Sequence, residues 1–210
     1  GVQMGGWFKK EIKTLEDFKG LKMRIPGIGA EIINRLGGTA VNMPPGEIMP
    51  ALQQGVIDAT EWVGPWVDKI SGLHKIAKYY YGPGIHEPGT ANELVMSKDK
   101  WQDLPNHLKE IVKNSCHAIY IESLAEFLHF NSLSLEELKS QHNVKVLNFN
   151  SEIMNAMFKI SRSVITEFSE LGEIHKEIYK SWQNSLNKYN KYQKFSDYGY
   201  IKERINSLKI

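Results

Sequence analysis

One long segment without a helix-breaking residue constrains this fold more than any other feature of the sequence. It runs from Pro105, a residue that the first turn of a helix tolerates, to about Gln141, with no proline or glycine between them. Apolar residues recur in it at helical spacing, as at Leu108, Ile111 and Ile119. Because an α-helix rises about 1.5 Å per residue, a helix of this length crosses a whole domain. The sequence therefore predicts one long helix that connects different parts of the fold.

The first hundred residues have a different pattern, in which short apolar runs alternate with short helical ones. Prolines and glycines separate most of these runs, as turns require. Strands that alternate with helices are typical of parallel βαβ units, so this part predicts an α/β lobe. The expected strands are residues 21–25, 39–43 and 56–60, and the expected helices are residues 14–18, 30–36 and 47–54.

After the long helix the sequence predicts a returning strand and further helices. The strand covers residues 144–149, and a helix that begins at Asn150 or Ser151 continues until Gly172 interrupts it. A last helix covers Glu173 to about Tyr189, and the tail rich in lysine, tyrosine and asparagine is expected to wrap the surface. We therefore expect two parts. Residues 1–103 form an α/β ligand-binding lobe, and residues 104–210 hold the long connecting helix, the returning strand and the C-terminal helices.

Composition excludes several classes of protein. The chain has 210 residues, of which 41% are hydrophobic and 24% charged, so it can bury a sizeable core in one large domain or two small ones. Its net charge is +2 with no basic stripe, which argues against a nucleic-acid partner. No apolar run approaches the roughly 18 residues that cross a bilayer. The single cysteine, Cys116, cannot form an internal disulfide and is expected to be buried in the long helix.

Arg24 is the first candidate binding residue. It lies at the carboxyl end of an expected strand, and open α/β sheets bind ligands in the crevice outside those strand ends. A guanidinium group there can hold a carboxylate through two parallel hydrogen bonds. From spacing, however, a solvated arginine at a strand end explains the pattern at least as well.

Glu61 is the second candidate, in the segment Leu52–Trp66. It follows an expected strand and precedes a turn that contains Trp62 and Trp66. A carboxylate near an apolar wall needs a cation or hydrogen-bond donors to stay ionised, and Arg24 or a metal ion could supply that charge. A surface glutamate beside core tryptophans remains an equal alternative.

Glu87 is the third candidate, in the turn-rich loop Gly84–Gly89. The neighbouring His86 suggests zinc, but the seven histidines of the chain show no zinc-ligand spacing. The side-chain oxygens of Gln3, Glu61 and Glu87 favour a hard cation instead.

An enzyme is the alternative to a binding protein. Glu61 and Glu87 could act as acid and base, which leaves a lyase or hydrolase open. No nucleophile elbow accompanies them. Gly27 and Gly29 open a helix after a strand, as in dinucleotide-binding folds, but Ile32 stands at the third glycine position, so we expect no dinucleotide site.

Five segments together resemble the DctP family, the extracytoplasmic solute receptors of TRAP transporters. The likeness is strongest to the branch that binds 2-oxo acids such as pyruvate. Each segment is weak evidence separately, but their shared order is specific, and they cover roughly the first hundred residues. The segments are residues 3–12, 21–27, 46–48, 51–65 and 88–91.

The resemblance implies an α/β fold of the class II periplasmic-binding-protein type. Two α/β lobes, joined by strands and a long helix, would close around the ligand like a hinge. The first lobe and a signal peptide would lie mostly before Gly1, so we expect this chain to be an N-terminally truncated fragment. The resemblance also implies a periplasmic location, no catalysis and delivery of a small organic anion to a TRAP permease. A receptor that feeds a signalling partner instead stays open, as does a homodimer built on the helix around Tyr179–Tyr192.

The resemblance also implies roles for individual residues. The family's arginine that pairs with the substrate carboxylate falls on Arg24. Gln3, Glu61 and Glu87 match the side-chain ligands of a bridging cation, usually sodium, and Trp62 matches the residue that gives a backbone carbonyl. Gln3, Arg24 and Trp62 would then contact the substrate, while Gln3, Glu61, Trp62 and Glu87 would hold the cation.

Overall fold

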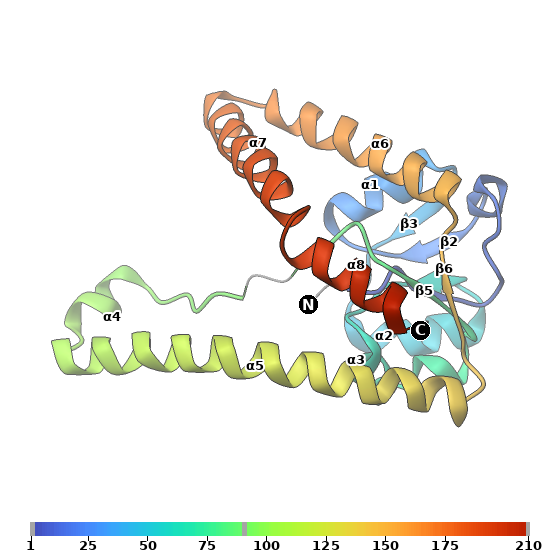
Figure 1. Cartoon of the computed structure of the whole chain (residues 1–210), viewed down its shortest axis with the longest axis horizontal. Helices are drawn as coiled ribbons and strands as arrows, with labels where there is room; N and C mark the ends of the chain where they lie inside the picture. Colours follow the sequence, from blue (N-terminus) through green and yellow to red (C-terminus); the bar gives the residue numbers. More distant parts are fainter. Residues whose placement is uncertain (1–2, 90–91, 209–210) are drawn as a thin grey trace. The chain divides into compact units, whose positions relative to one another are not determined.

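The computed structural model describes residues 3–89 and 92–208 of the chain. Contacts divide the chain after Ile160 into two units. The first unit holds a mixed sheet and the helices around it (Figure 1). No helix in the described ranges is long and apolar enough to cross a membrane. The second unit holds the end of α6 (Ser151–Ser169) together with α7 (Glu173–Gln193) and α8 (Asp197–Leu208).

The sheet of the first unit is mixed. Its strands follow the order β3-β2-β4-β1-β5-β6. The pairs β2–β3, β2–β4 and β5–β6 are parallel, whereas β1 is antiparallel to both of its neighbours. The strands are β1 (Gly6–Phe8), β2 (Lys22–Arg24), β3 (Thr39–Val41), β4 (Ala59–Thr60), β5 (Tyr79–Gly82) and β6 (Lys145–Asn148).

Short helices connect the strands of the first half, and one long helix follows them. The long helix, α5, has 35 residues and confirms the prediction made from the segment without helix breakers. The helices of this unit are η1 (Leu15–Phe18), α1 (Gly27–Arg35), α2 (Pro45–Gln54), α3 (Pro65–Ile70), η2 (Leu73–Lys75), α4 (Lys98–Asp103) and α5 (Asn106–Ser140), followed by the start of α6.

The expected strands and helices are largely confirmed, with one correction in the first lobe and one in the C-terminal tail. The expected strand at residues 56–60 is shorter, because the backbone amides of Val56 and Ile57 donate to the Ala51 carbonyl at the end of α2. The segment expected to wrap the surface forms α8 instead, in which Ile201 and Ile205 recur at helical spacing.

Two hydrophobic clusters cover the two faces of the sheet. Successive residues of a strand point to opposite faces, so Trp7 and Phe8 belong to different clusters, as do Tyr80 and Tyr81. The Phe8 face is covered by α1 and α6, and the Trp7 face by α2 and the end of α5. Buried members of the two clusters include Met23, Ile32, Ile33, Ile153 and Met157 on the first face, and Ile48, Leu52, Ile57 and Leu138 on the second.

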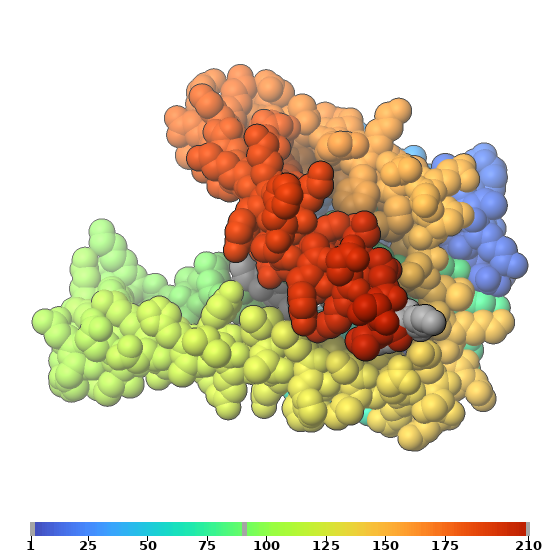
Figure 2. Space-filling view, viewed as in Figure 1, coloured from blue at the N-terminus to red at the C-terminus, as the bar shows by residue number. Residues whose placement is uncertain are grey.

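The long helix is buried towards its C-terminal end. Its buried residues are Ser134 and Leu138, and it packs there against α3. Cys116 is exposed, which corrects the expectation of a buried cysteine. Cys116 belongs to the first half of α5, whereas the buried residues of this helix, Ser134 and Leu138, lie near its end. This first half extends away from the sheet (Figure 1) and lies at the surface in yellow-green (Figure 2).

Candidate ligand and cation site

The candidate site forms at the edge of the sheet where the parallel strands β2 and β4 end. Arg24 is the last residue of β2 and pairs with Thr60, the last residue of β4. Glu61 follows directly, and its backbone amide donates to the Arg24 carbonyl at 3.1 Å. Both candidates therefore lie at the carboxyl edge of the parallel strands, where open α/β sheets bind ligands.

Two further segments reach this edge because β1 is antiparallel to β4 and β5. Gln3 precedes β1, and residues 83–87 follow β5. The backbone amide of Gly84 donates to the Gln3 carbonyl at 2.8 Å, which ties this loop to the start of β1. Gln3 Nε2 also donates to Glu87 Oε2 at 2.9 Å. Residues that are far apart in the sequence thus meet at one edge of the sheet.

Arg24 and Glu61 form a buried ion pair at the centre of the site. Arg24 Nη1 donates to Glu61 Oε1 at 2.6 Å, and the two side chains are 9% and 3% exposed. Arg24 Nε makes a longer contact of 3.5 Å with the Met43 carbonyl. A buried charge that loses its partner is strongly destabilising, so each group depends on the other in this state. A ligand carboxylate that drew Arg24 away from Glu61 would leave Glu61 in need of another positive partner.

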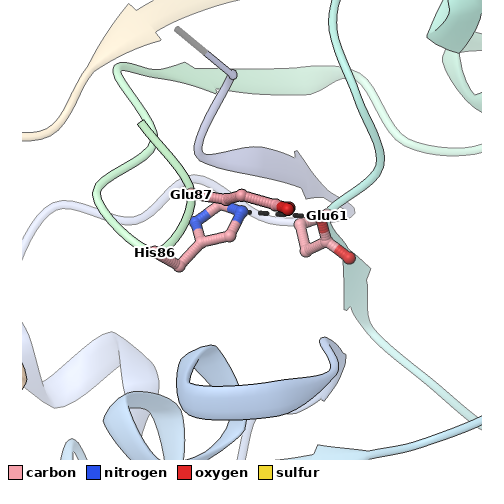
Figure 3. Close-up of side chains that lie close together, drawn as sticks. All are labelled: Glu61, His86 and Glu87. Carbon is pink, nitrogen blue, oxygen red and sulfur yellow. Dashed lines mark ion pairs between the residues drawn. The ribbon is translucent and has the colours of Figure 1, made fainter. Parts of the chain in front are cut away.

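The oxygens around Glu61 suit a hard cation. Glu61, His86 and Glu87 each place one possible ligand atom within 4.8 Å of the others (Figure 3). Gln3 adds an amide group that contacts Glu87. Carboxylate and amide oxygens are the donors that Ca²⁺ and similar ions prefer. The residues that the sequence predicts as cation ligands therefore fit such an ion in their chemistry and are brought together by the fold.

Trp62 lines the same site through its ring. The Arg24 guanidinium carbon lies 5.5 Å from the centre of this ring, a cation–π contact. The indole Nε1 is buried and has no hydrogen-bond partner in the described ranges, so it remains a donor available to a ligand. The predicted part of the Trp62 carbonyl in cation binding stays a prediction.

The structure adds a buried residue beside the site that the sequence did not indicate, Asp68. Its Oδ1 accepts from the backbone amides of Val63 and Gly64, both at 2.9 Å. Its Oδ2 accepts from Trp7 Nε1 at 2.8 Å and from the Tyr80 hydroxyl at 2.7 Å. Burial raises the pKa of Asp68, and these four donors oppose that rise. Asp68 thereby fixes the backbone directly after Glu61 and Trp62.

Sequence reasoning missed Asp68 and His86 for different reasons. Asp68 lies in the first turn of α3, where an acidic residue is favourable. Its presence there is therefore explained by the helix and indicates no further role. Its partners Trp7 and Tyr80 face it only because β1 and β5 are neighbours, and the sequence pattern indicated neither strand. His86 stands beside Glu87 in the sequence, but no zinc-ligand spacing accompanies it, so its residue type alone indicates no role at the site.

A family model and a characterised relative both match this chain. The family model is DctP, bacterial extracellular solute-binding protein family 7, which matches residues 1–171. A monocarboxylate 2-oxoacid-binding periplasmic protein of Nostoc sp. is 41% identical over 183 residues, which cover 87% of this chain and 50% of the relative. The chain therefore spans about half the length of the curated relatives it matches.

Solved structures of TRAP solute-binding proteins share the fold. One from Pseudoalteromonas atlantica, with bound sodium and pyruvate, has a TM-score of 0.86 and 37% identity, over 96% of this chain and 61% of its own. One from Bordetella bronchiseptica, a mixed-occupancy dimer with calcium and picolinate, has a TM-score of 0.90 and 34% identity, over 100% and 62%.

These matches confirm the predicted family and fold class. The family model covers most of the chain, and the sheet with its long helix matches solved structures of TRAP periplasmic solute-binding proteins. The remaining part of those longer structures has no counterpart in this chain. The chain belongs to the DctP family of bacterial extracellular solute-binding proteins.

Proposed function

We propose that this chain belongs to a periplasmic solute-binding protein that captures a small 2-oxo monocarboxylate, such as pyruvate, together with a hard cation. The protein would deliver this anion to a TRAP membrane permease. The observation that carries the proposal is the buried Arg24 guanidinium, which lies 2.6 Å from Glu61 at the carboxyl edge of the sheet. Related proteins described with pyruvate and sodium, or with picolinate and calcium, support this ligand class.

Each predicted residue has a place in this proposal. Arg24 binds the ligand carboxylate, and Gln3 and Trp62 line the same pocket. Gln3, Glu61, Trp62 and Glu87 hold the cation, which supplies positive charge for the keto and carboxylate oxygens of the ligand. Arg24 and Glu61 neutralise each other in the structure, so a carboxylate on Arg24 would compete with Glu61, and a cation on Glu61 would relieve that competition. Anion and cation should therefore bind cooperatively.

The proposal also assigns different roles to the two parts of the chain. Residues 1–103 supply the binding edge of one lobe, and residues 104–210 supply the connecting helix, the returning strand and the C-terminal helices. The part of the longer TRAP solute-binding proteins that has no counterpart here would close over the ligand. Closure needs a ligand that binds the closed state more tightly than the open one.

We propose that the protein binds its ligand without catalysis. Family members are solute-binding proteins, and the Glu61 carboxylate is held by a 2.6 Å ion pair rather than placed to exchange a proton with Glu87. A lyase or hydrolase that uses Glu61 and Glu87 is the alternative. Turnover of pyruvate by the purified full-length protein, followed by NMR, would favour that alternative.

Calorimetric titration with pyruvate tests the proposed ligand and the role of Arg24. In the full-length protein, Arg24→Ala should weaken pyruvate binding by about 2–4 kcal/mol, because a charge-assisted bidentate contact is lost. Pyruvamide, which lacks the negative charge, is the matched ligand and should bind wild type and variant about equally weakly. A folded Arg24→Ala protein that binds pyruvate as tightly as wild type would contradict the assignment.

A homodimer through α7 is a further part of the proposal. Exposed apolar residues recur every three or four positions on this helix, as at Ile178, Trp182, Leu186 and Tyr189. The Bordetella relative is described as a dimer. Analytical ultracentrifugation should show a dimer that Trp182→Lys converts to a monomer, whereas Asn184→Lys on the opposite side of the helix leaves it intact. A monomeric wild type would contradict this part.

A further inference from the structure

A third possible ligand atom lies beside the two carboxylates of the cation site. His86 Nε2 lies 3.4 Å from Glu61 Oε2, and the His86 side chain is 10% exposed. In the described part of the chain this nitrogen is buried and has no hydrogen-bond partner. Figure 3 shows the imidazole pointing towards Glu61 and lying beside Glu87. Buried polar atoms are almost always satisfied, and the 3.4 Å contact with Glu61 is longer than a usual hydrogen bond, so this nitrogen is placed for a closer partner.

The fold holds the His86 ring in this position through two glycines. A Cβ atom at Gly84 would lie 3.0 Å from His86 Cε1, and one at Gly29 would lie 3.2 Å from His86 Cβ. Both distances are tighter than ordinary contacts, so a larger residue at either position would push the His86 side chain. The start of α1 thus packs against the base of this side chain and the loop after β5 against its ring, which limits how far the imidazole can turn away from Glu61.

The charges at the site favour a divalent ion. Arg24, Glu61 and Glu87 together carry one net negative charge. A bound monocarboxylate adds a second negative charge. A divalent cation brings the sum to zero, whereas sodium would leave one negative charge in a partly buried site, where an uncompensated charge is costly.

We propose that His86 is a nitrogen ligand of this site, so that it accepts a divalent ion that binds imidazole, such as Ni²⁺ or Zn²⁺, as well as Ca²⁺. The inference rests on the cation site of the proposed function. Imidazole suits Zn²⁺ and Ni²⁺, while carboxylates suit Ca²⁺, and this site offers both. The three ligand atoms lie within 4.8 Å of one another, so side-chain shifts of about 1 Å bring them to metal distances near 2 Å.

Calorimetric titrations of the full-length protein with NiCl₂ and with CaCl₂, both without a 2-oxo acid, test the assignment. His86→Gln should weaken Ni²⁺ binding at least about tenfold and change Ca²⁺ binding by less than about threefold. His107→Gln removes an exposed histidine of α5 and controls for Ni²⁺ bound at the surface. It should change neither affinity.

Two results would overturn the inference. Unchanged Ni²⁺ affinity in His86→Gln would show that His86 is not a ligand. Equal losses for both ions would show that His86 only positions Glu61. Failure of the proposed function gives a different result. Pyruvate would then not bind in the presence of Ca²⁺, while His86→Gln would still selectively weaken Ni²⁺ binding. If pyruvate binds in the presence of Ca²⁺ and His86→Gln leaves the Ni²⁺ affinity unchanged, the inference about His86 fails and the proposed function stands.

Discussion

Arg24→Met should lower the free energy of unfolding of the ligand-free protein by about 3–5 kcal/mol, the range found when one partner of a buried ion pair is removed. The substitution keeps the length and the apolar stem of the side chain but removes the charge. Glu61, which is 3% exposed, would then remain as a buried carboxylate without its 2.6 Å partner. Urea unfolding followed by tryptophan fluorescence measures the change.

The double variant Arg24→Met/Glu61→Gln separates this charge effect from lost packing. It removes both charges, so most of the lost stability should return, because a buried pair replaced by neutral groups is often close to neutral in stability. Pyruvate binding should stay weak in the double variant, since the carboxylate partner is still missing. If the double variant is as unstable as Arg24→Met, packing rather than the unpaired Glu61 charge explains the loss.

Asp68→Ala should have an effect of similar size, about 3–5 kcal/mol, because four buried donors lose their acceptor at about 1–3 kcal/mol each and the loop relaxes in part. The donors are the backbone amides of Val63 and Gly64, the Trp7 indole and the Tyr80 hydroxyl. The same loop carries Glu61 and Trp62, so the variant should also weaken cation binding. Urea unfolding and a CaCl₂ titration measure the two effects.

Two variants serve as controls for Asp68→Ala. Tyr80→Phe removes one donor and leaves the other three bonds, so it should cost about 1–3 kcal/mol. Asp103→Ala removes an exposed aspartate at the end of α4 and should change stability by less than about 0.5 kcal/mol. An Asp68→Ala cost as small as that of Asp103→Ala would contradict the positioning role.

The sequence predicts the parallel strands β2 and β3 because each of them is followed by a turn and a helical pattern. The segments at residues 21–25 and 39–43 show this pattern, and β2 and β3 form there. β1 and β5 could not be predicted in the same way. Each is short, with three or four residues, and is defined by its pairing with a distant segment rather than by local periodicity.

The candidate site is predictable only to the extent that its residues follow predictable strands. Arg24 and Glu61 end such strands, so their meeting at one edge could be expected. Asp68 and His86 depend on β1 and on the loop after β5, whose positions follow from the tertiary pairing. Gln3 and Glu87 were placed by resemblance to a family, and the structure brings them within a hydrogen bond of each other.

Cooperative binding of anion and cation is the central claim, and the pyruvate dissociation constant with and without a cation tests it most directly. Calorimetry on the full-length protein would compare a sodium-free buffer with EDTA and the same buffer with saturating CaCl₂. Because a carboxylate competes with Glu61 for Arg24 and a cation would compensate Glu61, we expect Ca²⁺ to tighten pyruvate binding at least about tenfold, within the usual range of coupling between sites. Equal dissociation constants in the two buffers would contradict the account.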